Sequence, residues 1–322
     1  MSAKRALINA TLVLGLLLAA YLLYRVFSRY TLSEVVESIR AIPGLRLIAG
    51  LGFAAGSYVC LTGFDWLALR YAGKPLPYPK AALASFTSLS IGHNLGFAAL
   101  SSGAVRYRFY SRAGLNAEEI AKVILFCGLT VGIGLSALAG LALLFNPQDA
   151  ANLLKLNRAG LFSLGLACLG FPALYLVLSA TLRAPLHLRK WRFEMPSLKI
   201  AFGQVFIGTL NFIFVAACLR QMLVAQGNVS FVQTATAYVL ANLAVLTTHV
   251  PGGLGVLEAT ISHVLPGAAS IGALVAFRMI YFLLPLLIGL PVFAISEVVF
   301  HRRKKVSEDN ADQPADAQTQ LL

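Results

Sequence analysis

Charge is scarce in this chain. Of its 322 residues 12% are charged and 58% are hydrophobic, whereas a soluble domain carries about 25% charged residues. Apolar runs of about 20 residues, the length that crosses a hydrocarbon core, take the place of a charged surface. The composition excludes a soluble globular protein and predicts an all-α polytopic membrane protein. A transmembrane barrel would show short alternating segments instead.

Several chemical signatures are also missing. The sequence contains no G-x-x-x-x-G-K-[ST] phosphate loop, no G-x-S-x-G and no H-E-x-x-H, so it supports neither ATP-driven pumping nor these hydrolase chemistries. Its cysteines, Cys60, Cys127, Cys168 and Cys218, fall in apolar runs without a C-x-x-C, which indicates helix packing. We therefore expect no enzyme activity, no metal and no cofactor.

Basic residues outnumber acidic ones, and the net charge is +13. They gather at the ends of apolar runs, which favours positive-inside topology and anionic lipid headgroups over nucleic acid as the partner. Residues 1–305 are expected to form one flippase-like membrane domain, and the acidic stretch 306–322 a disordered cytoplasmic tail. The first apolar run is interpreted as a retained helix rather than a signal peptide. The clear spanning candidates are 6–27, 45–69, 121–145, 159–180, 199–219 and 270–300.

Two further apolar stretches, 81–105 and 231–265, do not fit as single spans. The basic loops place both ends of stretch 81–105 in the cytoplasm and both ends of stretch 231–265 outside the cell. Both termini of the chain are expected in the cytoplasm. Each stretch is interrupted, by "IGHNLG" and by "THVPGGLG". Irregular backbone at membrane depth is tolerated when it is buried in protein or lines a cavity, and paired interruptions indicate a transporter's binding site. We predict about six spanning helices and two re-entrant helical hairpins of opposite orientation, whose tips meet near the midplane. Two ordinary kinked helices are the alternative.

The interrupted segments supply most of the candidate site. His93 and His249 could carry protons near neutral pH or cap the tip backbone. A metal site that combines them with His263 and Glu258 lacks compact ligand spacing. The residues expected to shape the tips are Gly92, Gly96, Gly103, Pro251, Gly252, Gly253 and Gly255. The residues expected in a polar cavity are His93, Asn94, His249, Glu258 and Asp65.

Arg278 lies about nine residues into the last span, too deep for its head to reach water easily. A central arginine costs about 2.5–3.5 kcal/mol to insert, so it needs a partner. An ion pair with Glu258 and a phosphate clamp are both compatible with its position. Asp65 is expected to face Arg70 or Lys74, and Glu297 is expected at the membrane interface.

The segment "GAVRYRFYSR" interleaves arginine with tyrosine. On a helix, Arg106 and Tyr110 share one face while Arg108 and Arg112 share another. Arginine forks suit phosphate and tyrosine suits the headgroup layer, although an ordinary positive-inside anchor would look similar. The candidate phosphate and headgroup ligands are Arg106, Arg108, Arg278, Tyr107 and Tyr110.

Two motifs, "SIGHNLGFAALSSGAVRYRFYSRAGL" and "THVPGGLGVLEATI", resemble the membrane domain of the lysylphosphatidylglycerol synthase and flippase family, the multiple peptide resistance factor. The resemblance covers about residues 1–305 and implies a bacterial cytoplasmic-membrane protein that moves aminoacylated phosphatidylglycerol to the outer leaflet. Full-length relatives carry a C-terminal synthase domain, which does not follow residue 305 here, so the expectation is a stand-alone membrane domain without lysyl transfer. The positions that match the family motifs are Gly103, Arg106, Pro251, Gly252, Gly253 and Glu258.

The leading hypothesis is a translocator for phosphatidylglycerol or an aminoacylated or otherwise modified phospholipid. The alternatives are a secondary transporter of a small anion and a non-transporting membrane subunit that accompanies a lipid-modifying enzyme. The expected partners are membrane phospholipids, a separately encoded lipid-modifying enzyme and a second copy of the chain.

Overall fold

The computed structural model describes residues 32–95, 98–145, 156–182, 186–188, 191–225, 227–248 and 250–311. Nearly all of them are helical, which confirms the all-α class. The helices are α2 (Leu32–Arg40), α3 (Gly44–Tyr71), α4 (Tyr78–Leu95), α5 (Ala98–Arg112), α6 (Ala117–Phe145), α8 (Arg158–Thr181), α9 (Leu198–Leu223), α10 (Phe231–Thr248), η1 (Pro251–Gly253), α11 (Val256–Val264), α12 (Ile271–Arg278), η2 (Met279–Leu283) and α13 (Leu284–Ala311). Two three-residue strands, β1 (Leu186–Leu188) and β2 (Trp191–Phe193), pair antiparallel between α8 and α9.

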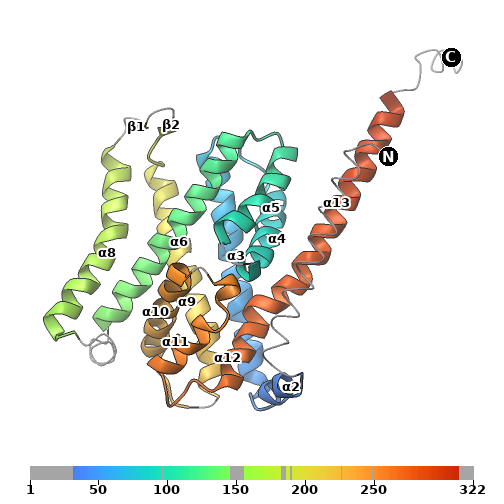
Figure 1. Ribbon diagram of the computed structural model, residues 1–322. Coiled ribbons are helices and arrows are strands. Elements are labelled where there is room, and N and C mark those ends of the chain that lie inside the picture. Colours follow the sequence, from blue (N-terminus) through green and yellow to red (C-terminus); the bar gives the residue numbers. More distant parts are fainter. Residues whose placement is uncertain are drawn as a thin grey trace, which may run out of the picture.

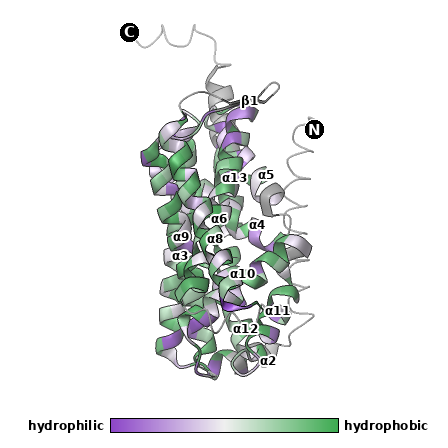
Figure 2. Ribbon diagram, turned by 90° about the vertical axis from the view of Figure 1, so that its left-hand side faces the viewer, coloured by the Kyte–Doolittle hydropathy of each residue, from purple (hydrophilic) through white to green (hydrophobic). Residues whose placement is uncertain are grey.

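Six helices among the described residues are long and apolar enough to cross a membrane. They are α3, α6, α8, α9, α10 and the continuous α12–η2–α13 helix as far as Phe300, and hydrophobic residues cover their lengths in Figure 2. The protein is therefore a multi-pass membrane protein. Five of these helices coincide with predicted spans, the predicted span 6–27 lies outside the described residues, and α10 belongs to a stretch that was assigned to a hairpin.

The two interrupted stretches both form helical hairpins. α4 packs against α5, and α10 packs against α11. In Figure 1 the α4–α5 hairpin occupies the upper half of the molecule and the α10–α11 hairpin the lower half, with their breaks facing each other between them; Figure 2 shows the same order. The two hairpins thus point in opposite directions, as predicted. That they re-enter a bilayer stays a prediction.

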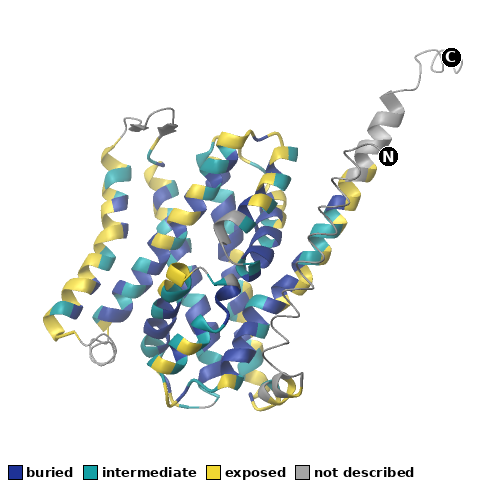
Figure 3. Ribbon diagram, in the orientation of Figure 1, coloured by how far each residue is buried: buried dark blue, intermediate teal, exposed yellow. Residues whose placement is uncertain are grey.

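Close backbone contacts hold the long helices around the hairpins. A Cβ atom on Gly134 of α6 would lie 2.3 Å from the carbonyl oxygen of Gly208 in α9, so only glycine allows this approach. Such small-residue contacts are typical of membrane helices. Figure 3 shows buried residues on the faces that α3, α6 and α9 turn inward, whereas α8 is largely exposed. Cys60, Cys127 and Cys218 are buried in this core and all four cysteines are free, as expected of packing residues.

The C-terminal helix is longer than the sequence suggested. α13 continues to Ala311, beyond the boundary expected at residue 305. The remainder of the expected tail, 312–322, lies outside the described residues.

Candidate functional site

The two hairpin tips contact each other. A Cβ atom on Gly252 would lie 3.1 Å from the carbonyl oxygen of Asn94. The side-chain amide of Asn94 donates hydrogen bonds to the carbonyl oxygens of Ser90, at 2.9 Å, and Phe282, at 3.1 Å. The predicted meeting of the tips is confirmed, and Asn94 is the residue that ties the first tip to the last long helix. Gly96 and His249 lie outside the described residues.

The glycines of the second tip are required by its backbone. Gly252, Gly253 and Gly255 have φ angles of 62°, 59° and 83°, a left-handed region that residues with a Cβ enter only at a cost. Gly92 of the first tip serves a different purpose, because a Cβ there would lie 2.7 Å from the Cβ of Ser102. It lets α4 and α5 approach closely just before the break.

Arg278 holds the second tip together. Its Nε donates to Oε1 of Glu258 at 2.6 Å, and its Nη1 donates to the carbonyl oxygen of Gly252 at 2.8 Å. Oε2 of Glu258 accepts from the backbone N–H of Gly255 at 2.8 Å. The predicted ion pair between Arg278 and Glu258 is confirmed, and it locks α11 to α12 through the turn. With its guanidinium engaged by the tip, Arg278 has a clear structural role.

A π-helical turn, η2, directly follows Arg278. Such turns shift the hydrogen-bond register of a helix and often occur at functional sites. The carbonyl of Phe282 in this turn accepts from Asn94. The hydroxyl of Tyr281 lies 2.8 Å from Oγ of Ser57, which donates to Oδ1 of Asn211 at 2.7 Å. Because a serine hydroxyl has one hydrogen, Tyr281 is the donor to Ser57. Ser57, Asn211 and Tyr281 were not predicted from the sequence, since each looks like an isolated polar group in an apolar helix.

Asp65 and Arg106 form a buried bidentate ion pair. Arg106 donates from Nε to Oδ1 and from Nη2 to Oδ2, both at 2.8 Å, while Tyr110 donates its hydroxyl to Oδ1 at 2.8 Å. Nη1 of Arg106 reaches Oγ of Ser102 at 3.0 Å. The side chains of Asp65 and Arg106 are 0% and 3% exposed. This arrangement joins α5, the second arm of the α4–α5 hairpin, to α3.

The expected partners of Asp65 were wrong. The guanidinium of Arg70 lies over the ring of Trp66, 3.3 Å from its centroid, and Lys74 pairs with Glu119 at 3.6 Å. Asp65 lies on the buried face of α3, so it needs a cation that is buried with it. Arg106 meets that need, whereas Arg70 lies at the exposed end of α3 and Lys74 in the exposed loop that follows it.

The other arginines of α5 share a second carboxylate. Nη2 of Arg108 lies 2.7 Å from Oε2 of Glu297, and Nη2 of Arg112 lies 2.6 Å from the same oxygen. The two predicted faces of this helix are thereby confirmed. The side chain of Glu297 is 1% exposed. That it lies at the membrane interface stays a prediction. Tyr107 is half exposed.

A cavity of about 560 Å³ lies between the two tips and the long helices. Its volume falls within the range of small-molecule sites, about 300–1,000 Å³. Most of its wall is apolar. Its polar lining residues are His93, Ser102, Arg106, Asn211, Tyr238, Asn242 and Tyr281. Of the residues predicted to line a polar cavity, His93 does so. Asn94 and Asp65 bind residues that line it, Phe282 and Arg106, whereas Glu258 binds Arg278 and Gly255, which lie outside the lining.

Two lining groups have hydrogen-bonding capacity to spare. Nδ1 of His93 is buried and has no hydrogen-bond partner among the described residues. The hydrogen bonds of Arg106 use three of its N–H groups, and a guanidinium has five. The cavity can therefore offer donors to an anionic group while its apolar wall receives hydrocarbon.

Comparisons of the sequence with known proteins identify relatives along most of the chain. The model of the family described as "Lysylphosphatidylglycerol synthase TM region" matches residues 12–289, a span that includes both hairpins and Arg278. The uncharacterized protein slr0712 of Synechocystis sp. is 29% identical over 287 residues, which cover 88% of this chain and 89% of that protein. Inner membrane protein YbhN of Escherichia coli is 28% identical over 271 residues, 82% of this chain and 84% of its own length.

Proposed function

This chain belongs to the family described as the lysylphosphatidylglycerol synthase TM region, and from that premise we propose that it is a flippase-like translocator of phospholipids. Its substrate would be phosphatidylglycerol or an aminoacylated or otherwise modified phospholipid. Similarity to an inner membrane protein of Escherichia coli supports the bacterial inner membrane as its location. A separately encoded lipid-modifying enzyme would supply any modified headgroup, because the proposal gives this chain no catalytic step.

The observation that carries the proposal is the cavity where the hairpin tips meet. A phospholipid headgroup must leave water and cross the hydrocarbon layer, where each unsatisfied polar group costs several kcal/mol. Here the cavity is bounded by two interrupted helices, by apolar walls and by Arg106. Under this proposal, the chamber shields the headgroup from hydrocarbon as it crosses.

Arg106 is the residue best placed to meet the phosphate. Asp65 holds its guanidinium from behind, so the side chain is oriented before a ligand arrives. The pair has no net charge, which lowers the cost of keeping it buried when the cavity holds no anion. A bound phosphodiester would accept hydrogen bonds from the N–H groups of Arg106 that do not bind Asp65 or Ser102.

Two glycines of α6 allow a direct test. Gly128 and Gly132 line the cavity, and a Cβ on either would have no heavy atom within 4 Å. Gly132→Phe should therefore fold and place a ring in the cavity. We expect it to reduce the movement of fluorescent phosphatidylglycerol between leaflets of proteoliposomes to the level of protein-free liposomes. Gly170→Phe is the matched control, because Gly170 of α8 is equally open and lies outside the cavity.

The assay separates the competing functions. Equal lipid movement by wild type and empty liposomes, with phosphatidylglycerol and with its lysyl ester, would contradict translocation. If the same vesicles instead take up a small soluble anion and Gly132→Phe blocks that uptake, the chain is a secondary anion transporter. A His93→Gln variant that keeps its rate but loses its response to a proton gradient would assign proton coupling to this histidine.

A further inference from the structure

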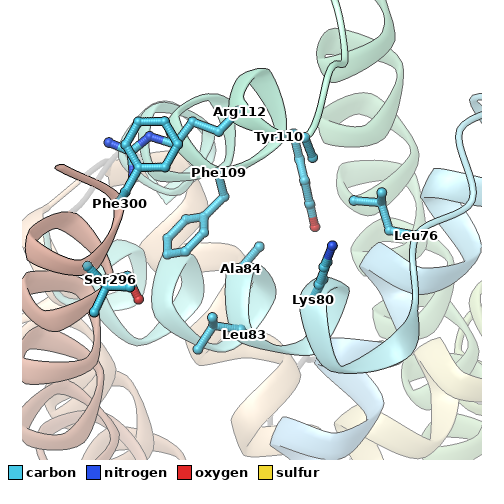
Figure 4. A pocket seen from close by; sticks show the side chains of 11 residues that line it. Leu76, Lys80, Leu83, Ala84, Phe109, Tyr110, Arg112, Ser296 and Phe300 are labelled. Carbon is cyan, nitrogen blue, oxygen red and sulfur yellow. The ribbon is translucent and has the colours of Figure 1, made fainter. Parts of the chain in front are cut away.

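A second hollow lies away from the central cavity. It has a volume of about 410 Å³, lies between the start of α4, the end of α5 and α13, and shares no lining residue with the cavity. In Figure 4 the side chains from the three helices converge on it. We call it the α13 groove. The lining residues that matter below are Lys80, Leu83, Tyr110, Arg112, Ser296 and Phe300.

The groove carries a surplus of positive charge. Arg108 and Arg112 share the single carboxylate of Glu297. Lys80 is exposed and forms no ion pair with any described residue. Lys80 and Arg112 line the groove, and with the neighbouring Arg108 and Glu297 the local net charge is +2. An anionic occupant is the electrostatic complement.

The same groove also presents apolar surface. Leu83 and Phe300 are 41% and 37% exposed, although both are large hydrophobic side chains. The guanidinium of Arg112 lies over the ring of Phe300, 4.1 Å from its centroid, which keeps a cation at the edge of the apolar wall. Cations beside exposed hydrocarbon suit an amphiphile better than a free inorganic anion.

We propose that the α13 groove binds one anionic phospholipid, with its phosphodiester between Lys80 and Arg112 and its acyl chains along Leu83 and Phe300. The hydroxyl of Ser296 lies in the same wall. Residues 1–31, which lie outside the described residues, contain four basic and no acidic residues, so they are not a charge complement for the groove. Binding here requires no translocation, and the inference does not rest on the proposed function.

The groove also adjoins the central cavity through one ion pair. Tyr110 lines the groove, and its hydroxyl donates to Asp65. Asp65 in turn holds Arg106, which lines the cavity. A lipid in the groove therefore lies on the other side of the Asp65–Arg106 pair from the chamber.

Lys80 is the residue to change, because it is exposed and the fold does not depend on an ion pair there. Lys80→Met keeps the length of the side chain and removes its charge. We expect native mass spectrometry of the purified protein to show about fivefold less phosphatidylglycerol retained, relative to phosphatidylcholine at equal concentration. Lys80→Arg should retain the preference. Lys199→Met is the matched control, since Lys199 is an exposed lysine at the start of α9, outside the groove.

Two results would overturn the site. The first is an unchanged preference for phosphatidylglycerol in Lys80→Met. The second is an equal loss in Lys199→Met, which would mean that the overall charge of the protein attracts the lipid. Because retention is measured without any transport step, neither result bears on whether lipid crosses through the cavity.

Discussion

At the scale of the residue, buried arginines are paired with carboxylates from other elements. Arg106 of α5 binds Asp65 of α3, and Arg278 of α12 binds Glu258 of α11. Breaking such a pair by removing one partner is strongly destabilising, because a charge then stays buried without compensation. These contacts therefore fix the hairpins to the long helices as well as place donors near the cavity.

Only one of these pairs could be read from the sequence. Glu258 and Arg278 are isolated charges in neighbouring apolar segments, 20 residues apart, so each has few other partners. Asp65 has Arg70 and Lys74 nearby in sequence, and its true partner is 41 residues away. Which cation is buried with it depends on the packing of α5 against α3, and local spacing holds no information about that packing.

Neutralising Asp65 should be costly. Asp65→Asn leaves the Arg106 charge buried, and we expect the free energy of unfolding to fall by about 3–5 kcal/mol. Denaturation of the detergent-solubilised protein measures this change. Glu118→Gln, which removes an exposed pair with Lys122, should change stability by less than about 1 kcal/mol. If Asp65→Leu combined with Arg106→Leu is no more stable than Asp65→Asn, an uncompensated charge is not the cause.

At the scale of the element, the sequence located both breaks correctly. Glycines mark the first break, and glycines with a proline mark the second, because these residues interrupt helices in a way that can be read locally. The π turn at Met279–Leu283 could not be predicted in the same way. Its residues, "MIYFL", contain neither glycine nor proline and read as ordinary helix. The π turn is recognised only in the structure, where Asn94 of α4 hydrogen-bonds to Phe282 and Ser57 of α3 hydrogen-bonds to Tyr281.

The second tip should tolerate no Cβ at Gly253. This residue has a φ of 59°, and a Cβ there would lie 2.7 Å from Cγ2 of Val245. The left-handed conformation alone costs about 1–2 kcal/mol, so we expect Gly253→Ala to lower the free energy of unfolding by at least that amount. Gly267→Ala is the control, since a Cβ at Gly267 would have no heavy atom within 4 Å. Equal stability of the two variants would show that the turn is not constrained as described.

At the scale of the whole molecule, the counting of basic residues predicted the direction of the chain through successive elements. The two hairpins lie on opposite halves of the molecule, which is compatible with that counting, and the side of the membrane on which each begins stays a prediction. The length of α10 was not anticipated, since 18 helical residues can cross a membrane by themselves. α11, with nine residues, is too short to do so.

Accessibility of single cysteines tests this arrangement. In a variant without the four native cysteines, we expect Asn228→Cys and Gly267→Cys, at the two ends of the α10–α11 hairpin, to react with an impermeant maleimide from outside intact cells. Asn116→Cys, just beyond the α4–α5 hairpin, should react only after the membrane is opened. The native residues at all three positions are exposed. Labelling of Asn228→Cys and Gly267→Cys from opposite sides would contradict re-entry of the second hairpin.

The continuous helix formed by α12, η2 and α13 carries both Arg278 and Glu297, 19 positions apart in the sequence, which corresponds to roughly 28 Å along a helix. Arg278 binds the tip of the α10–α11 hairpin, and Glu297 binds α5 of the α4–α5 hairpin. One continuous helix, which contains the π turn and Pro291, is thus attached to both hairpins, and a displacement of either hairpin that keeps its ion pair must move or bend this helix. We expect movements of the two hairpins to be coupled through this helix, with Arg278 and Glu297 as the two points of attachment.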